Sequence, residues 1–341
     1  MRQTNKTKKT GVLRKIFAKI SRLMGYELID QANLSFVNSS DKENPSKIGN
    51  KIITLPLGEV KITRKIKSLH IILKTCTSVN LVSQNKKRIF ECDKSEYTFR
   101  TINSLIKSLK KARDNIKNIN FFVTIIDSGS NNIDLEKIEI KMKNSKFDFN
   151  IERLNLNNYE KKIKVIDKKN TEIERNMKST MASILRSFEL TKAKVEDLVY
   201  FVEDDYVHKE DSIIEMIATY EKFSTIFEKD IFLLPVDYPY LYQKDEMSEV
   251  FIGKNYHWRS VKESLLTFLT SKKIIDEYYD ELMSMAKTEH LPFEAILHKI
   301  YNMEKCFSPI PSLAIHCTNV NSVFGLSPNI NAKKIWDQNE N

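Results

Sequence analysis

Three consecutive carboxylates, Glu203, Asp204 and Asp205, directly follow an apolar run at residues 198–202. Such a run predicts a buried strand, so the three acidic side chains stand where that strand ends. Neighbouring ionised carboxylates repel one another and are costly to remove from water, and a hard divalent cation with phosphate ligands would offset both effects. The triplet therefore predicts a Mg²⁺ or Mn²⁺ site, with a solvated acidic turn as the open alternative.

A second acidic residue, Asp127, follows the apolar run at 120–126 and begins a loop rich in turn-forming residues. We expect strands at residues 69–73, 120–126, 147–154 and 197–202, and helices at 97–112 and 173–190. This alternation predicts an α/β fold with a mostly parallel sheet flanked by helices. Sheets of this kind bind ligands at the carboxyl ends of their strands, where Asp127 and the acidic triplet both stand.

The second half of the chain continues the alternation less regularly. We expect a strand at 230–236, a strand or short buried segment at 265–269, helices at 274–285 and 291–302, and a loop at 308–317. The chain then divides into a basic amphipathic helix at 1–30, a linker or small extension at 31–67, a main domain at 68–330 and a disordered polar tail at 331–341.

Length and composition limit the remaining possibilities. With 341 residues and 41% hydrophobic content, the chain can bury the core of one large or two modest domains. Its four cysteines lack the close spacing of a zinc site or a disulfide framework, which favours a reducing, cytoplasmic setting. No run approaches the roughly 20 apolar residues of a membrane-spanning helix. We therefore expect a cytoplasmic protein that is either soluble or peripheral on the inner face of the cytoplasmic membrane.

The first 30 residues carry eight Lys and Arg residues against two acidic ones. Between residues 12 and 24, apolar residues recur at helical spacing with basic residues beside them, the pattern of a helix that lies on an anionic membrane surface. An amphipathic helix that docks on its own domain would show the same pattern. Nucleic acid is not an expected partner, because this basic stretch has one aromatic residue and no recognisable reading motif.

Taken in order, these motifs resemble those of glycosyltransferases with the GT-A fold, most of all the family 2 nucleotide-sugar enzymes. Thr75, at the end of the first strand, and the Asp127 turn are similar to the elements of that family that contact the donor nucleotide. The acidic triplet is similar to the metal-binding Asp-x-Asp motif, in a Glu-Asp-Asp variant. The resemblance covers about residues 68–320 and departs from the family at Asn132, where the family's turn motif ends in Asp.

The resemblance implies a GT-A (nucleotide-diphospho-sugar transferase) catalytic domain and a metal-dependent hexosyltransferase. Such an enzyme moves a sugar from a nucleotide-sugar donor to a glycan, lipid-linked or polysaccharide acceptor, as in polysaccharide or lipopolysaccharide biosynthesis. The resemblance places Thr75, Asp127 and Asp204 at the donor and Asp205 at the metal ion, Mn²⁺ or Mg²⁺. His316 is the best-placed histidine for a further metal ligand, and a structural histidine is the alternative.

The acceptor side of the site has candidates as well. Glu294 stands near the start of an expected helix, where inverting GT-A enzymes carry the base that deprotonates the acceptor hydroxyl. The helix dipole alone also favours an acid there, and Glu289 is the alternative base. Tyr240, Trp258 and Arg259 are candidate acceptor contacts, because sugars stack on aromatic rings and Arg attracts anionic groups. Core packing is the alternative role for these aromatic residues.

Two other functions fit parts of the pattern. A sugar nucleotidyltransferase has a similar sheet and metal-binding carboxylates, but it normally carries a Gly-rich phosphate loop near its first strand. This chain has no glycine between Gly58 and Gly129. A non-catalytic, membrane-associated carbohydrate-binding or scaffold protein would use the acidic triplet only as a surface turn.

Overall fold

The computed structural model describes residues 12–26, 52–55, 58–78, 87–166, 171–318 and 320–340. The chain divides into two compact units, Met1–Pro45 with Ile52–Val60, and Ser46–Lys51 with Lys61–Asn341. Of the expected linker, residues 31–51 lie outside the described part of the chain. Among the helices that the structure describes, none has the length and apolar content needed to cross a membrane.

The smaller unit contains an amphipathic helix, α1 (Val12–Leu23). It lies within the helix expected at 1–30, of which residues 1–11 and 27–30 lie outside the described part of the chain. Its strand β1 (Ile52–Leu55) pairs with β2 (Gly58–Lys61) in a two-stranded sheet. The large apolar side chains in and just after α1 are exposed, namely Val12, Leu13, Ile16, Phe17, Ile20, Leu23 and Met24. The helix contains no acidic residue, so its polar positions are neutral or basic.

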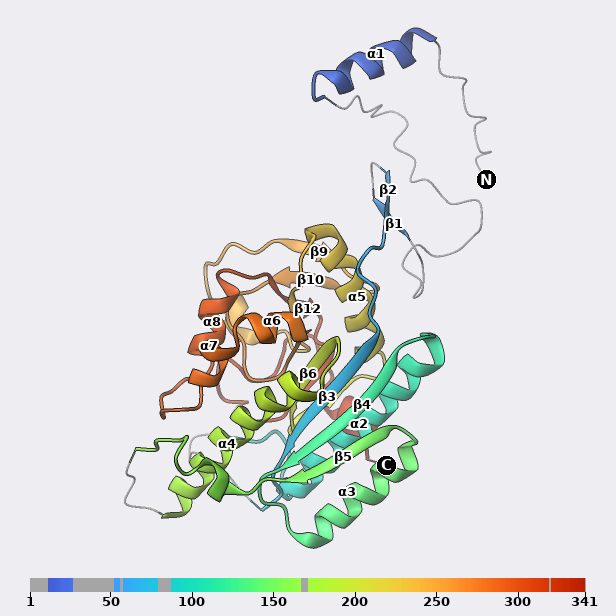
Figure 1. Cartoon of the computed structure of the whole chain (residues 1–341). Coiled ribbons are helices and arrows are strands. Elements are labelled where there is room, and N and C mark those ends of the chain that lie inside the picture. The colour runs from blue at the N-terminus through green and yellow to red at the C-terminus, as the bar shows by residue number, and fades with distance from the viewer. Residues whose placement is uncertain are drawn as a thin grey trace. The chain divides into compact units, whose positions relative to one another are not determined.

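The larger unit is built on a nine-stranded sheet (Figure 1). In spatial order its strands are β5 (Asp148–Arg153), β4 (Asn120–Asp127), β3 (Ser68–Thr75), β6 (Leu198–Glu203), β11 (Phe268–Ser271), β8 (Phe232–Leu233), β12 (Cys306–Ile310), β10 (His257–Ser260) and β9 (Val250–Ile252). The four strands from β5 to β6 are parallel to one another, and β8 is parallel to β12. Strands β10 and β11 run antiparallel to their neighbours.

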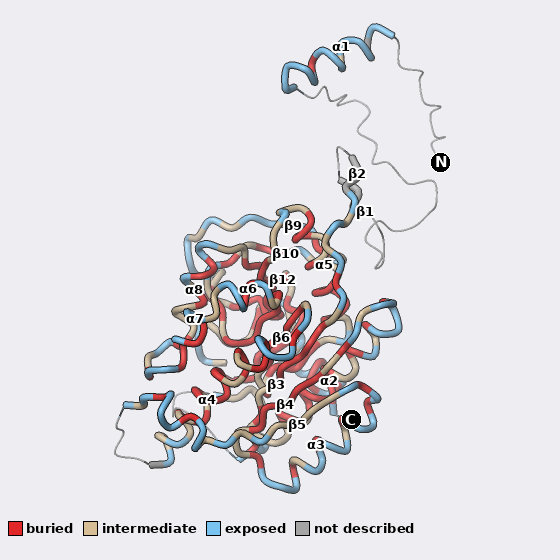
Figure 2. The backbone as a smooth tube through the Cα atoms, viewed as in Figure 1, coloured by how far each residue is buried: buried red, intermediate tan, exposed pale blue. Residues whose placement is uncertain are grey.

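Helices cover both faces of this sheet. One face packs on α2 (Lys94–Asn115), α3 (Asn132–Ser145) and α5 (Ser212–Phe227), and the other on α4 (Thr171–Lys194), α6 (Lys272–Glu277), α7 (Tyr279–Ser284) and α8 (Ala295–Tyr301). Alternate residues of β3 serve the two cores, since Ile71 belongs to the first and Ile72 to the second. Figure 2 shows the resulting band of buried backbone along β3, β4 and β6.

The predicted fold class, α/β with a mostly parallel sheet flanked by helices, is confirmed. The four strands and two helices expected in the first half correspond to β3, β4, β5, β6, α2 and α4, while α3 was not anticipated. The helix expected at 274–285 is divided into α6 and α7 at Tyr278, and the one expected at 291–302 shortens to α8.

Two sequence-based expectations near the C-terminus are wrong. The segment 308–317, expected as a loop because of its prolines, contains the end of β12 and the strand β13 (Ala314–His316). Pro309 is tolerated in β12 because it lies beyond the pairing with β8 and has only β10 beside it. The expected disordered tail contains α9 (Ala332–Asp337), whose Trp336 is buried against Tyr97.

A second, two-stranded sheet connects distant parts of the larger unit. Strand β7 (Tyr206–His208), which follows the acidic triplet, pairs antiparallel with β13. In this register Tyr206 lies opposite His316. The pairing brings residues that are more than a hundred positions apart to one end of the main sheet.

Candidate functional site

The carboxyl ends of β3, β4 and β6 place most of the predicted donor residues side by side. In the parallel register, Thr75 lies opposite Asp127, and Lys74 lies opposite Glu203. The sequence-based expectation that Asp127 and the acidic triplet share one edge of the sheet is therefore met in the structure. This edge is the candidate site.

Asp127 is fully buried and held from several directions. Its carboxylate accepts a hydrogen bond from the Thr75 hydroxyl, 3.1 Å long, and bonds of 3.2 Å to each oxygen from the Ser130 amide. The Arg153 guanidinium lies 3.8 Å away. Buried carboxylates need such donors, and here the turn that begins at Asp127 supplies one of them itself.

Asp204 has both of its oxygens occupied. The Thr98 hydroxyl, at 2.7 Å, and the Cys76 amide, at 3.1 Å, donate to Oδ2, and the Lys94 ammonium pairs with Oδ1. Lys94 and Thr98 are the first and fifth residues of α2, so the start of this helix lies directly on the triplet. Sequence reasoning missed both residues. The only signal for them is their i, i+4 spacing at a helix start, which many helices share.

Asp205 faces His316 across the β7–β13 pair, with 3.5 Å between Oδ2 and Nε2. The His316 Nδ1 donates to the Phe324 carbonyl at 2.9 Å, which leaves Nε2 directed at the carboxylate. The imidazole also stacks on the Tyr206 ring, with centroids 4.7 Å apart. The predicted metal residues Asp205 and His316 are thus brought together.

Burial and charge act in opposite directions on this pair. Burial alone lowers the pKa of His316, but the charge and hydrogen bond of Asp205 outweigh it and leave the pKa above its ordinary value. Burial likewise raises the pKa of Asp205, and the opposing charges of His316 and Lys94 bring it well below the usual range. Each group therefore favours the charged form of the other.

Every carboxylate of the triplet has its own basic partner. Glu203 Oε1 lies 3.3 Å from the Lys74 ammonium, Asp204 pairs with Lys94, and Asp205 pairs with His316. The negative charge of the triplet, from which a metal ion was predicted, is thus already balanced by basic side chains of the protein. A ligand that binds here has to share these partners or replace them.

A divalent cation fits part of this arrangement. Two ligands whose bonds to one ion are about 2.1 Å long must lie within about 4.2 Å of each other, and the 3.5 Å between Asp205 and His316 meets that condition. Within the described ranges, no three His, Cys, Asp or Glu side chains form a metal cluster. Mg²⁺ commonly uses one or two carboxylates plus substrate phosphates, so two protein ligands suffice for an ion shared with a phosphate ligand.

The predicted base, Glu294, stands at the N-terminus of α8, where its side chain makes no capping hydrogen bond. Burial raises the pKa of Tyr238 far above its ordinary value, and the charges of Glu203, Asp205 and Glu294 raise it further. Glu294 and two acids of the triplet therefore act electrostatically on the same buried tyrosine. The alternative base, Glu289, instead accepts a 2.9 Å hydrogen bond from the Ile166 amide, a structural contact.

The predicted acceptor residues do not offer a binding surface. Trp258 is fully buried and donates from its indole nitrogen to Glu215 at 3.2 Å, and the buried Tyr240 donates to the Glu263 carbonyl at 2.8 Å. A ring without an exposed face cannot stack on a sugar. Arg259 is also buried and paired with Asp237. The alternative role, core packing, holds for the two aromatic residues, and Arg259 serves a buried ion pair.

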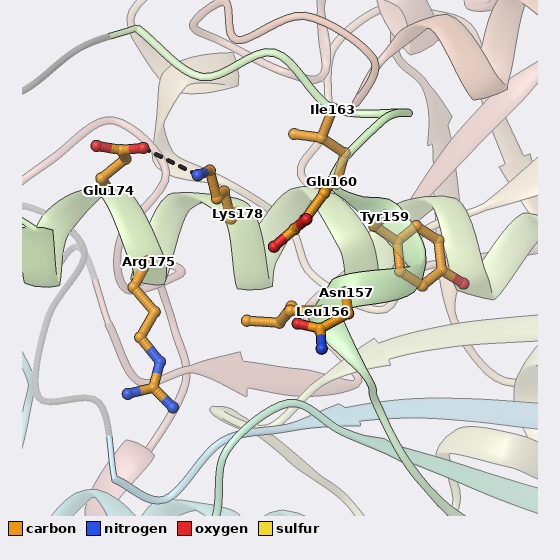
Figure 3. A pocket seen from close by; sticks show the side chains of 8 residues that line it. All are labelled: Leu156, Asn157, Tyr159, Glu160, Ile163, Glu174, Arg175 and Lys178. Carbon is orange, nitrogen blue, oxygen red and sulfur yellow. Dashed lines mark ion pairs between the residues drawn. The ribbon is translucent and has the colours of Figure 1, made fainter.

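A pocket of about 360 Å³ lies next to this edge, between η2 (Leu156–Tyr159) and the first turns of α4 (Figure 3). It is lined by Leu156, Asn157, Tyr159, Glu160, Ile163, Glu174, Arg175 and Lys178. Figure 3 shows Glu174 paired with Lys178, at 2.9 Å, while Arg175 points away from that pair. Next along α4, Ser179 donates to the Ser128 carbonyl at 3.1 Å, so the helix that lines the pocket also contacts the Asp127 turn.

No protein-family model and no curated protein matches the chain. Among solved structures, it is similar to S. aureus TarS at 15% identity and a TM-score of 0.34, covering 62% of this chain and 29% of TarS. It is also similar to the galactosyltransferase LgtC in complex with donor and acceptor sugar analogues, at 10% identity and a TM-score of 0.35, covering 70% and 72% of the two chains.

A UDP-glucose pyrophosphorylase complexed with UDP-glucose is a further neighbour, at 9% identity and a TM-score of 0.41, covering 81% of this chain and 97% of that one. The chain thus spans less than a third of the length of TarS and nearly all of the pyrophosphorylase. At these identities and TM-scores, the likenesses do not decide between a transferase and a pyrophosphorylase.

Proposed function

We propose that this protein is a metal-dependent glycosyltransferase with a GT-A-type fold. The single observation that supports it best is the meeting of Asp127, the acidic triplet and His316 at the carboxyl edge of the parallel strands. This edge is where open α/β sheets bind ligands, and its residues suit a nucleoside diphosphate with a cation. The donor is a nucleotide-sugar, and the acceptor is a glycan, lipid-linked or polysaccharide molecule, as in cell-surface polysaccharide or lipopolysaccharide synthesis.

On the donor side, Thr75 and Asp127 bind the nucleoside and Asp204 orients it. Asp127 is held rigidly by Thr75 and Ser130, so its carboxylate is already in place when the donor arrives. Asp204 connects β6 to the first turn of α2 and thereby fixes the position of that helix beside the donor. Residues so constrained lose little conformational entropy on binding.

Asp205 and His316 would hold the cation, Mn²⁺ or Mg²⁺, together with the diphosphate. When bound, the ion stabilises the negative charge that develops on the leaving diphosphate as the sugar C1–O bond breaks. Hydrogen bonding to Phe324 fixes the orientation of the His316 ring, so that Nε2 faces Asp205. The protein itself orients both ligand atoms before any ligand binds.

Glu294 is the proposed base that removes the proton from the attacking acceptor hydroxyl, which gives inversion at C1. Its charge reaches Tyr238, whose hydroxyl lies 2.7 Å from that of Tyr206. Tyr206 in turn stacks on His316.

The test is a panel of UDP- and GDP-sugars with Mn²⁺, read by release of nucleoside diphosphate and by sugar transfer. We expect turnover that chelation abolishes, and Glu294→Gln should lower kcat by about 100-fold or more. Asp114→Ala, which removes an exposed carboxylate at the end of α2, is the matched control. Release of pyrophosphate from a nucleoside triphosphate and a sugar phosphate would instead identify a nucleotidyltransferase.

We also propose that α1 binds an anionic membrane surface. Its exposed apolar residues and the exposed Lys15, Lys19 and Arg22, without any acid in the helix, match the charge and polarity of such a surface. The full chain should co-sediment with vesicles that contain an anionic lipid and lose this binding when residues 1–25 are deleted. Equal sedimentation of the two proteins would contradict the proposal.

A further inference from the structure

Lys94 is a charged partner of the acidic triplet that sequence reasoning missed. It is the first residue of α2, and its ammonium pairs with Oδ1 of Asp204. The side chains of Lys94 and Asp204 are only 13% and 12% exposed. The pair is therefore shielded from water, and its attraction is stronger than that of a surface ion pair.

The Lys94 ammonium also lies in the field of Asp205. Burial alone lowers the pKa of Lys94, but the charges of Asp204 and Asp205 outweigh burial and the opposing charge of Arg88, so the pKa stays above its ordinary value. Lys94 is thus charged at neutral pH. A positive charge that acts on Asp205 also repels any cation that approaches that carboxylate.

We propose that Lys94 is a built-in counter-ion that prevents the triplet from binding a divalent cation alone and couples cation binding to the nucleoside diphosphate. The inference rests on the proposed function. When the diphosphate is present, its phosphate oxygens accept the ammonium and also share the cation, so the repulsion between the two positive charges is relieved. The ammonium is a compact charge on a flexible stem, and it can turn from Asp204 to a phosphate oxygen.

The other contacts of Asp204 allow this exchange without loss of the local structure. The Thr98 hydroxyl and the Cys76 amide still hold Oδ2 when the ammonium leaves Oδ1. The amino end of the 22-residue helix α2 also favours a negative group near Lys94. Lys94 is therefore a ligand-binding residue that pairs with the Asp204 carboxylate as long as no diphosphate is bound.

The experiment measures Mn²⁺ binding directly, by the spin-resonance signal of free Mn²⁺, with and without UDP or GDP. The wild-type protein should bind Mn²⁺ at least tenfold more tightly when the nucleotide is present. Lys94→Gln, which keeps a hydrogen-bond donor for Asp204 but removes the charge, should bind Mn²⁺ alone at least tenfold more tightly than wild type. It should also lose most of the enhancement by nucleotide, whereas Lys94→Arg should retain it.

Lys272→Gln is the matched control, because Lys272 is the first residue of α6 and also pairs with a carboxylate, that of Asp276. It should leave the Mn²⁺ affinity and its dependence on nucleotide unchanged. If folded Lys94→Gln behaves as wild type in both titrations, Lys94 is only a structural partner and the inference is overturned. If wild type and variant bind no Mn²⁺ with either nucleotide, the metal site of the proposed function fails, and this inference fails with it.

Discussion

The two ends of the same parallel strands hold their charges in different ways. At the amino ends, the Arg64 guanidinium pairs with both oxygens of Asp197 and donates from Nε to Asp230 at 3.1 Å. At the carboxyl ends, each acid of the triplet meets a lysine or a histidine instead. A forked guanidinium joins several elements and always stays charged. Ammonium and imidazole groups can exchange partners, so the first edge is structural and the second suits a ligand.

Asp205→Ala should give the largest effect and would separate the two edges most clearly. We expect nucleoside diphosphate release to fall by about 100- to 1000-fold, because a group that positions charge at the reacting centre is lost. Some unfolding free energy should be lost with the ion pair, but less than for a buried charge left unpaired, because His316 can lose its proton and keep its bond to Phe324. A large loss of stability with normal turnover would mean that this edge is structural too.

Asp197→Ala tests the amino edge. Arg64 would lose its forked partner, and the unfolding free energy should fall by about 2 kcal/mol, less than the 3–5 kcal/mol of a fully buried pair, because Arg64 is 27% exposed. Urea denaturation measures the loss. The kcat of the folded fraction should match that of wild type, and a selective loss of kcat would break the comparison.

Two buried histidines on the paired strands β7 and β13 differ in charge, since His316 has a raised pKa and His208 a lowered one. Burial lowers the pKa of His208 to about 3, whereas an unfolded histidine titrates near 6.5. Between these values the unfolded chain binds more protons, so this group's contribution to stability is present above about pH 6.5 and is lost as the pH falls. Wild type should lose up to about 1.4 kcal/mol more per pH unit than His208→Gln between pH 6 and 4, measured by urea denaturation. Parallel pH profiles would contradict this account.

The smallest effect is expected where a charge pair is exposed. Lys333 and Asp337 form an i, i+4 pair on α9 at 2.6 Å, and both side chains are at least half exposed. Lys333→Ala should change the unfolding free energy by less than about 0.5 kcal/mol. A larger change would show that exposure to water does not set how much these charge pairs contribute to stability.

The acids of the site could be predicted from the sequence, but most of their partners could not. Apolar runs locate β4 and β6, and parallel pairing then requires Asp127 and the triplet to meet at one edge. Lys94 and Thr98 are ordinary polar residues at a helix start. Their contact with Asp204 depends on how α2 docks on the sheet, and no local pattern records that.

The acceptor residues were predicted wrongly for a related reason. The local sequence of Trp258 and Arg259 is equally compatible with a sugar-binding surface and with a buried core. The burial of Trp258 depends on Glu215 of α5, which is itself fully buried. Glu215 accepts hydrogen bonds from the Trp258 indole and from the backbone amides of Lys254 and Asn255. This buried acid anchors β10 to α5, and its partners lie about 40 positions away in the sequence.

The pairing of β7 with β13 also sets an order in time. The triplet leaves the ribosome 111 positions before His316. At ordinary rates of synthesis that interval is on the order of ten seconds. During it, Asp205 has no imidazole beside it, and the strand that will cover it has not been made. The edge of the sheet that holds the candidate site is therefore completed late in translation, after most of the framework that supports it has been synthesised.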